Sequence, residues 1–193
     1  MESSFDELRR AQRKAGIAGR GGLTAEQRRL YSEQIVQRIL ASEAYQKAKV
    51  IFSYRAIKAE VSLLSLEAEA RAQGKTIAFP LCVAPGEMIA LVPDSEESWV
   101  EGSFHIPEPL RSLSTEIAPS DFDLMLCPCT AFDGQCRRMG MGGGYYDRYL
   151  PRCGNALITS VAFEAQKLPE IAVEPWDFAM DGVFTEAAFY SKP

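Results

Sequence analysis

The sequence predicts an α/β fold: a single three-layer domain with a mostly parallel sheet flanked by helices, and an N-terminal helical arm. Candidate strands alternate with candidate helices along the chain, and several strands are apolar at every position. A strand of that kind is buried on both faces, so helices must cover both sides of the sheet. The 193 residues suffice for one such domain, which we assign to residues 1–193, with residues 1–42 as the helical arm packed on it.

The composition is typical of a water-soluble globular protein. The chain is 47% hydrophobic and 24% charged. It has no apolar run of about 18 residues, the length needed to span a membrane. The first ten residues, "MESSFDELRR", lack the apolar core of a secretion signal. We therefore expect a cytoplasmic protein without a membrane partner, and the net charge of −5 argues against nucleic acid as the main partner.

The N-terminal arm is predicted to be basic and mostly helical. The first 40 residues carry eight Lys and Arg against five Asp and Glu, a net +3 on an acidic chain. Such an arm either meets an anionic ligand or is a solvated helical face. We predict a short helix over 4–15 and a mobile loop over the glycine-rich stretch 15–22, "AGIAGRGG". A second helix starts at Thr24, which forms a capping box with Gln27, and ends near Ser42.

Strands and helices alternate after the arm. A helix is predicted over 62–74, with Ser62 as N-cap and Gly74 as its stop, and another begins near Tyr145. Residues 93–121 are predicted to be mostly loop. The predicted strands are 50–55, 75–80, 87–92, 122–128, 156–163 and a short one near 183–185. Ligands of such sheets bind at the carboxyl ends of strands, so we expect the site in the segments after residues 55, 80, 128 and 163.

The cysteines and the single histidine argue against several kinds of chemistry. An odd number of cysteines without a secretion signal indicates reduced thiols. Their spacing in "CPCTAFDGQC" is C-x-C-x6-C, which is not a standard zinc pattern, so buried thiols are favoured over a metal–thiolate site. One histidine, His105, argues against Ser-His-Asp or Cys-His catalysis. The five cysteines are Cys82, Cys127, Cys129, Cys136 and Cys153.

The stretch "RRMGMGGGYYDRYL", residues 137–150, contains the strongest candidate for a binding loop. Glycines permit left-handed backbone and close approach of a ligand, and they precede a helix N-terminus, where N–H groups favour an anion such as phosphate. Arg137 and Arg138 add positive charge before the loop. The loop matches neither a P-loop nor a dinucleotide fingerprint. The glycines alone therefore leave a tight structural connection equally open.

The residues after the glycines favour a nucleotide site. Asp147 falls in the first helical turn, where a carboxylate is stabilised, and it is suited to hold Mg²⁺ beside a phosphate. Tyr145 and Tyr146 offer flat faces on which a ring can stack. The alternative is that Tyr146, Tyr149 and Leu150 form a core-facing stripe, which we expect for two of these three.

Motifs along most of the chain, taken together, resemble those of the 5-formyltetrahydrofolate cyclo-ligase family, also called methenyltetrahydrofolate synthetases. The glycine stretch, preceded by "AFDGQC", is similar to the family's R-L-G-x-G-x-G-Y-Y-D after F-D-x-x-G. The other similar motifs, in the family's order, are "LRR" near the start, "AEV" at 59–61, "FHIPEP" at 104–109 and "WDFAMDGVFTE" at 176–186.

The resemblance implies an ATP-dependent ring closure. In that family the formyl oxygen on N5 takes the γ-phosphoryl group of ATP, N10 attacks the formyl carbon, and loss of phosphate leaves 5,10-methenyltetrahydrofolate, with ADP as the other product. Phosphoryl transfer needs charge neutralisation and alignment rather than a histidine. The implied cofactors are ATP and Mg²⁺. The implied partner is a small molecule, 5-formyltetrahydrofolate with or without a polyglutamate tail, and we expect a monomer.

The resemblance also implies roles for individual residues. Arg138 and Tyr146 would be catalytic, and Asp147 and Asp177 would hold magnesium. The substrate would contact Arg55, Glu60, Phe104 and Tyr145. The nucleotide would contact Arg9, Arg138, Met139, Gly140, Met141, Gly142, Gly143, Gly144, Tyr145 and Tyr146. Structural alternatives remain for four of these: Glu60 as a helix cap, Asp177 as a loop tie, Arg9 as a solvated side chain and Phe104 as core.

The chain also departs from the family pattern. Phe5 stands where the family usually has a lysine, and Arg10 and Arg13 are candidates to replace it. Cys129 replaces a glycine, Trp176 replaces a histidine, and "AGRGG" resembles a small insertion. Two other functions therefore stay open: a non-catalytic folate- or nucleotide-binding relative, and an ATP-dependent ligase or kinase for another small molecule. A purely structural role is a further alternative.

Overall fold

The computed structural model describes residues 4–102 and 107–192, and its centre is an eight-stranded sheet. The strand order is β12-β11-β10-β7-β1-β2-β3-β6. The five strands from β11 to β2 run parallel, and β12, β3 and β6 are antiparallel to their neighbours. Bounds are β1 Val50–Phe52, β2 Thr76–Ala84, β3 Glu87–Pro93, β6 Ser114–Ile117, β7 Leu124–Pro128, β10 Leu157–Val161, β11 Gly182–Phe184 and β12 Phe189–Ser191.

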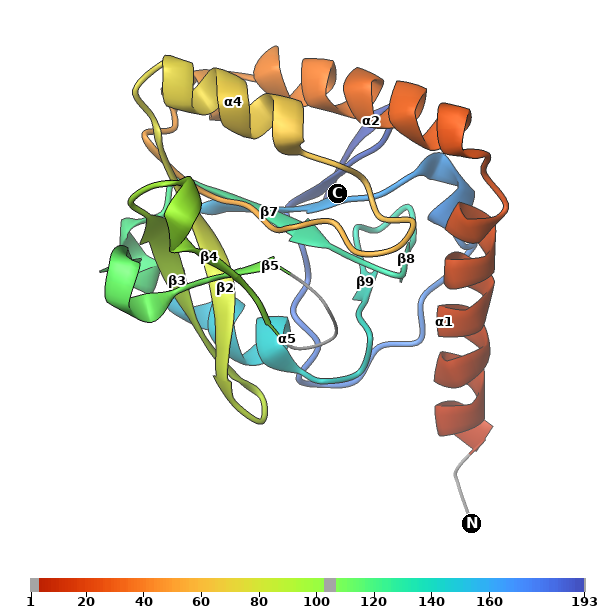
Figure 1. Cartoon of the computed structure of the whole chain (residues 1–193). Coiled ribbons are helices and arrows are strands. Elements are labelled where there is room, and N and C mark those ends of the chain that lie inside the picture. Colours follow the sequence, from red (N-terminus) through yellow and green to blue (C-terminus); the bar gives the residue numbers. More distant parts are fainter. Residues whose placement is uncertain (1–3, 103–106, 193) are drawn as a thin grey trace.

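Helices cover both faces of this sheet, which confirms the predicted fold class. The helices are α1 Ser4–Gly21, α2 Ala25–Leu40, α3 Glu43–Lys47, α4 Leu64–Ala72 and α5 Tyr145–Tyr149. Figure 1 shows α2 and α4 lying across one face and α5 on the other. Ile35 and Ile39 of α2 and Leu66 of α4 share one buried cluster with Leu124, while Phe52 belongs to a second cluster. The second cluster also holds Tyr149 and Leu150, the two core residues expected from the stripe after the glycines.

The segment between β3 and β7 contains more strand than the sequence predicted. A separate hairpin pairs β4 Trp99–Glu101 with β5 Pro107–Pro109, and β6 joins the main sheet. The sequence also missed β12, the last strand. Phe104 lies outside the described residues. Within the described ranges, none of the helices is long and apolar enough to cross a membrane.

The predicted N-cap of the second helix was confirmed at Thr24, whereas the N-cap predicted at Ser62 was wrong. Thr24 Oγ1 accepts from Gln27 N at 3.1 Å, and the Gln27 side chain accepts from Thr24 N at 2.9 Å, which completes the capping box. Helix α4 instead has Leu63 at its N-cap and no side-chain cap, and Ser62 precedes the helix with its amide bound to Ser32 Oγ of α2. Gly74 follows α4 in the left-handed region, at φ 72°, as a stop signal requires.

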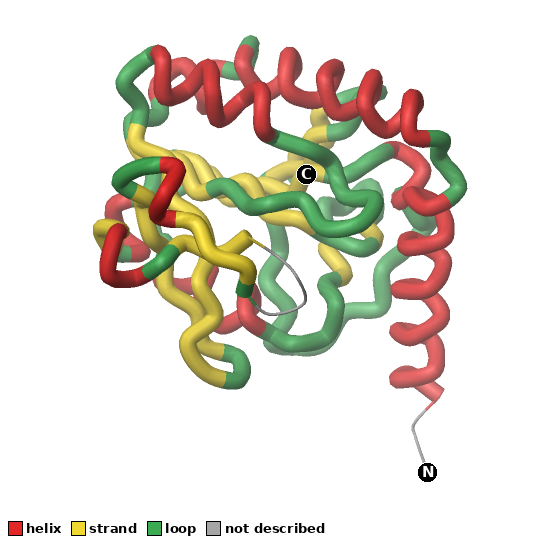
Figure 2. The backbone as a smooth tube through the Cα atoms, in the orientation of Figure 1, coloured by secondary structure: helices red, strands yellow, loops and turns green. Residues whose placement is uncertain are grey.

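Helix α1 runs through the stretch predicted to be a mobile loop, so that prediction was wrong. Figure 2 shows α1 as one continuous helix to Gly21. A Cβ built on Gly16 would lie 2.1 Å from Thr130 O, and one built on Gly19 would lie 2.0 Å from Ala165 O. These glycines allow α1 to approach the neighbouring backbone closely. The packing that this close approach allows outweighs the lower helix propensity of glycine, which costs about 1 kcal/mol per residue relative to alanine.

We expect Gly16→Ala to destabilise the protein and Gly21→Ala to leave it unchanged or slightly more stable. Overpacking a close contact costs roughly 1–3 kcal/mol, or roughly 2–4 °C of melting temperature per kcal/mol in a chain of this size. A Cβ on Gly21 would meet nothing within 4 Å. Thermal unfolding followed by circular dichroism measures both variants. Equal melting temperatures would show that α1 does not depend on this close approach.

Candidate active site

The site lies where several segments meet beyond the carboxyl ends of the central strands. After β7 the chain forms a small hairpin, β8 Ala131–Phe132 and β9 Arg138–Met139, and Figure 1 shows α1 beside it. After β10 the 3₁₀ turn η6, Glu164–Gln166, returns to β7: Gln166 Nε2 donates to Cys129 O at 2.8 Å and to Thr130 O at 3.0 Å. Arg20 Nη1 in turn donates to Cys129 O and to Glu60 Oε1, so the segments after β1, β7 and β10 are held together at one edge. The segment after residue 80 continues as strand β2 to Ala84, and the turn that follows packs at Gly86 against Arg148 of α5, next to the glycine loop.

The glycine loop joins β9 to α5. Gly142 and Gly144 have φ values of 101° and 67°, which a residue with a side chain rarely adopts, and Gly144 is the N-cap of α5. A Cβ on Gly143 would lie 2.8 Å from the ring of Tyr145. The backbone conformation at Gly142 and Gly144 and the close ring at Gly143 therefore favour glycine at these three positions. Helix α5 begins at Tyr145, as predicted.

The two methionines of the loop differ in position. Met139 is fully buried beside Ala131 and Ile171, so only its backbone is available to a ligand. Met139 O accepts hydrogen bonds from the amide and the hydroxyl of Thr130, which fixes the start of the loop. Met141 is exposed at the loop's tip.

Arg138 and Asp147 form an ion pair between the two ends of the glycine loop. Arg138 Nη2 lies 2.7 Å from Asp147 Oδ1, and its guanidinium lies over the ring of Tyr146, 5.2 Å from the centroid. Phe178 N also donates to Asp147 Oδ1, at 3.3 Å. Within the described residues, the buried Nε of Arg138 has no hydrogen-bond partner. Arg138 therefore keeps a donor available for a ligand.

Arg9 and Asp177 form a second ion pair across the same region. Arg9 Nη2 donates to Asp177 Oδ1 at 3.2 Å, and Arg9 Nη1 donates to Asp177 Oδ2 and to Ala172 O. Asp177 Oδ2 also accepts from Glu174 N at 2.9 Å. Arg9 is thus not a solvated side chain, and Asp177 does tie down its loop. Because Phe178 contacts Asp147, the two acids lie at the same end of the site.

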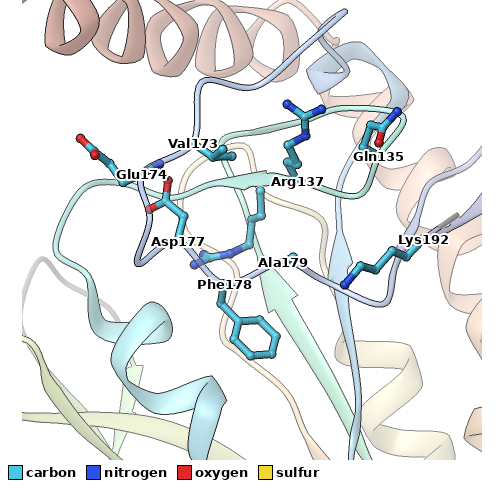
Figure 3. A pocket seen from close by; sticks show the side chains of 9 residues that line it. Gln135, Arg137, Val173, Glu174, Asp177, Phe178, Ala179 and Lys192 are labelled. Carbon is cyan, nitrogen blue, oxygen red and sulfur yellow. Dashed lines mark hydrogen bonds between the residues drawn. The ribbon is translucent and has the colours of Figure 1, made fainter.

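A cavity of about 340 Å³ lies between Arg138 and Asp177. Figure 3 shows Asp177 and Glu174 on one side and Gln135 and Lys192 on the other, with Phe178 below. Arg137 also lines it, so cations outnumber acids around this space. The volume is at the lower end of the range of small-molecule sites, about 300–1,000 Å³.

Glu60 is paired with Arg20 inside the protein. Arg20 Nη1 lies 3.2 Å from Glu60 Oε1, and the two side chains are 4% and 8% exposed. Glu60 Oε2 accepts from Ile57 N at 3.1 Å, so Glu60 does not cap α4. Burial raises the pKa of the Glu60 carboxyl, and the Ile57 amide and Arg20 oppose that shift.

Tyr146 and Arg55 are both held by aromatic neighbours. Tyr146 packs edge-on against Phe52, with centroids 6.1 Å apart, and burial raises its pKa well above the ordinary value, so it stays a phenol. Arg55 lies over the rings of Trp99 and Phe79, at 4.1 and 4.8 Å, and is paired with Glu67. Burial raises the pKa of Glu67 to about 7 despite that partner. Arg55 is therefore part of a packed structural unit, and its substrate contact remains a prediction.

The cysteines lie mostly in the core. All but Cys82 are buried, and burial raises the pKa of Cys127 and of Cys129 to about 12. Over residues 4–102 and 107–192, the structure holds no cluster of three or more histidine, cysteine or acidic ligands for a metal. Asp147 and Asp177 fit Mg²⁺ in another way, since that ion is usually bound by one or two carboxylates together with substrate phosphates. Asp147 Oδ2 makes no hydrogen bond to any described residue, so an oxygen is available for it.

Three residues near the site were given no definite role from the sequence, although Arg13 was named as a candidate to replace the lysine absent at Phe5. Asp133 is buried and accepts from the amides of Gln135, Arg137 and Ile171, which shapes the β8–β9 turn. The other two, Arg13 and Arg20, lie on α1. Their spacing from Arg9, by four and eleven positions, would have placed all three on one helix face had the helix been predicted at its full length.

The comparisons with known proteins agree with the architecture. The model of the 5-formyltetrahydrofolate cyclo-ligase family matches residues 6–186. A protein of Mus musculus named 5-formyltetrahydrofolate cyclo-ligase is 29% identical over 180 residues, 85% of this chain and 86% of the mouse protein. One of the same name from Haemophilus influenzae is 28% identical over 164 residues, 82% of this chain and 87% of that protein.

Solved structures show the same fold. The NMR structure of Aquifex aeolicus 5,10-methenyltetrahydrofolate synthetase is similar with a TM-score of 0.84 and 30% identity, covering 95% of this chain and 92% of that one. The structure of a 5,10-methenyltetrahydrofolate synthetase from Mycoplasma pneumoniae has a TM-score of 0.76 at 23% identity, covering 92% of this chain and 98% of that one, and supports the fold alone.

Proposed function

The chain belongs to the 5-formyltetrahydrofolate cyclo-ligase family and has cyclo-ligase activity, and we propose that its reaction uses ATP and Mg²⁺ at the glycine loop. The observation that supports this most directly is the pair of carboxylates at one end of the loop. Asp147 and Asp177 each face an arginine there, at Arg138 and Arg9. Arginines suit phosphate and carboxylates suit Mg²⁺, so the four side chains match the parts of a magnesium nucleotide.

The loop and its arginines serve to neutralise charge in this proposal. Arg138, through its unpartnered Nε, and the amides of 140–146 hold the phosphates of ATP. Asp147 and Asp177 hold Mg²⁺, which supplies positive charge to the transferred phosphoryl group. That group moves to the formyl oxygen on N5, and ADP leaves. N10 then attacks the formyl carbon and loses its proton, and phosphate departs with the oxygen to give 5,10-methenyltetrahydrofolate.

The folate half of the site is proposed to centre on Glu60. A buried carboxylate accepts hydrogen bonds from the amino and ring N–H groups of a pterin, and Arg20 compensates its charge in the free protein. Tyr145 and Tyr146 border the reacting part of the folate, and a polyglutamate tail is compatible with this arrangement. We further propose a cytoplasmic monomer that binds this small molecule and neither nucleic acid nor a membrane.

The test is to supply 5-formyltetrahydrofolate, ATP and Mg²⁺ and follow the near-ultraviolet absorbance of the methenyl product. We expect a rise that requires all three components. Tight folate binding without phosphate release would instead indicate a non-catalytic relative. Phosphate release only with a different small molecule would indicate another ATP-dependent ligase or kinase.

A further inference from the structure

Helix α1 presents one row of arginines to the site. Arg9, Arg13 and Arg20 share a helix face with Gly16, which brings that face onto the backbone of Thr130. At one end Arg9 contacts Asp177, and at the other Arg20 contacts Glu60. Arg13 lies between these two contacts, and Figure 1 shows α1 on the side of the fold where β9 leads into the glycine loop.

Arg13 is held against the glycine loop by a hydrogen bond to the backbone of that loop. Arg13 Nε donates to Gly140 O at 3.1 Å. A Cβ built on Gly142 would lie 3.7 Å from Arg13 Cζ, so the guanidinium lies beside the loop at the height that a side chain there would occupy. Within the described ranges its hydrogen bond runs through Nε, which leaves both terminal nitrogens for a ligand.

The positive charge of Arg13 is less fully neutralised than the charges of Arg9 and Arg138. Arg9 and Arg138 each have a carboxylate at hydrogen-bond distance, whereas the hydrogen bond of Arg13 is to a neutral carbonyl. Burial and the nearby charges of Arg9 and Arg10 lower the pKa of Arg13, while Asp177 and Asp6 partly oppose them. The guanidinium therefore lies in a region of positive potential that an anion would relieve.

We propose that Arg13 is a phosphate-binding residue of this chain and contacts the phosphates of the nucleotide through its two terminal nitrogens. This rests on the proposed use of ATP at the glycine loop. Two terminal nitrogens on a planar group can bind two phosphate oxygens together, so a nucleotide di- or triphosphate suits them. Arg13 thereby adds its positive charge to that of Arg9, whose Cζ lies 5.9 Å from the ring centroid of Phe5.

The experiment compares Arg13→Met with Lys14→Met. Lys14 is the next residue of α1 but is exposed, so its replacement removes the same charge from the same helix. Binding of ADP and of inorganic tripolyphosphate is measured by calorimetry, with and without Mg²⁺, and circular dichroism verifies folding. We expect Arg13→Met to weaken both ligands roughly 10- to 100-fold, the effect of losing charge-assisted hydrogen bonds, and Lys14→Met to change them less than about twofold.

Two further measurements separate binding from a structural role. Arg13→Lys is expected to recover part of the affinity, because it restores the charge without the planar pair of donors. The affinity for 5-formyltetrahydrofolate alone is expected to stay unchanged in all three variants. Unaltered ADP binding by folded Arg13→Met would overturn the assignment of Arg13 alone. Failure of the unmodified protein to bind ADP or tripolyphosphate would overturn the proposed nucleotide site and Arg13 with it.

Discussion

Replacing Asp177 with asparagine is expected to lower Mg²⁺-dependent ring closure by at least about 100-fold and, at the same time, to strengthen the binding of metal-free ADP. The loss follows from removing one of the two carboxylates proposed to hold the ion, since electrostatic groups at a reaction centre contribute roughly 10²–10³ in rate. The stronger binding of ADP follows from the ion pair between Asp177 and Arg9. Asp177 occupies both terminal nitrogens of Arg9, and asparagine would free that cation for phosphate.

Asp147→Asn is expected to behave in the same way, because Asp147 is bound to Arg138. Glu170→Gln is the matched control: Glu170 also pairs with an arginine, Arg137, but its side chain is 75% exposed, and surface pairs of this kind contribute little. Turnover is measured from the methenyl absorbance, and ADP binding by calorimetry in the presence of a chelator. Parallel loss of turnover and of metal-free ADP affinity would contradict the proposal, since the carboxylates would then serve to shape the site rather than to bind the ion.

The fold class was predictable because its signals are local. Fully apolar strands such as β7 can be buried only between two layers of helices, and the Thr24 capping box is contained within four residues. The end of α1 was not predictable in this way. Gly16 and Gly19 break a helix by local propensity, and only the backbone at Thr130 and Ala165, far away in the sequence, gives them a packing role.

The site shows the same division between local and distant information. Motifs identify Asp147 and Asp177 as candidates, but they do not reveal that Asp147 is paired with Arg138 across the glycine loop, or that Asp177 is paired with Arg9 from the distant helix α1. Arg20 shows how one wrongly predicted element hides a residue of the site. Because its segment was expected to be a mobile loop, a side chain that is almost fully buried against Glu60 was missed.

The pair of Arg20 and Glu60 is expected to give the largest change in stability. Removing one partner of a buried ion pair costs about 3–5 kcal/mol, so we expect Arg20→Met to lower the free energy of unfolding by about that amount. Without Arg20, the pKa of Glu60 in the folded state rises further above its unfolded value, so the folded state holds a proton that the unfolded state has released. The stability of Arg20→Met is therefore expected to fall more steeply than that of the parent as pH rises above the unfolded pKa.

The double variant Arg20→Met with Glu60→Gln separates stability from substrate recognition. It removes both buried charges, so we expect it to recover most of the stability lost in Arg20→Met and to lose the steep pH dependence. Affinity for 5-formyltetrahydrofolate is expected to be low in the double variant and in Glu60→Gln, because a neutral amide with one acceptor oxygen replaces the carboxylate proposed to accept two hydrogen bonds from the pterin. Denaturant unfolding across pH and calorimetric titration with the folate measure the two effects. If the double variant regained folate affinity along with stability, Glu60 would be a structural residue, and recognition of the pterin would have to come from other groups.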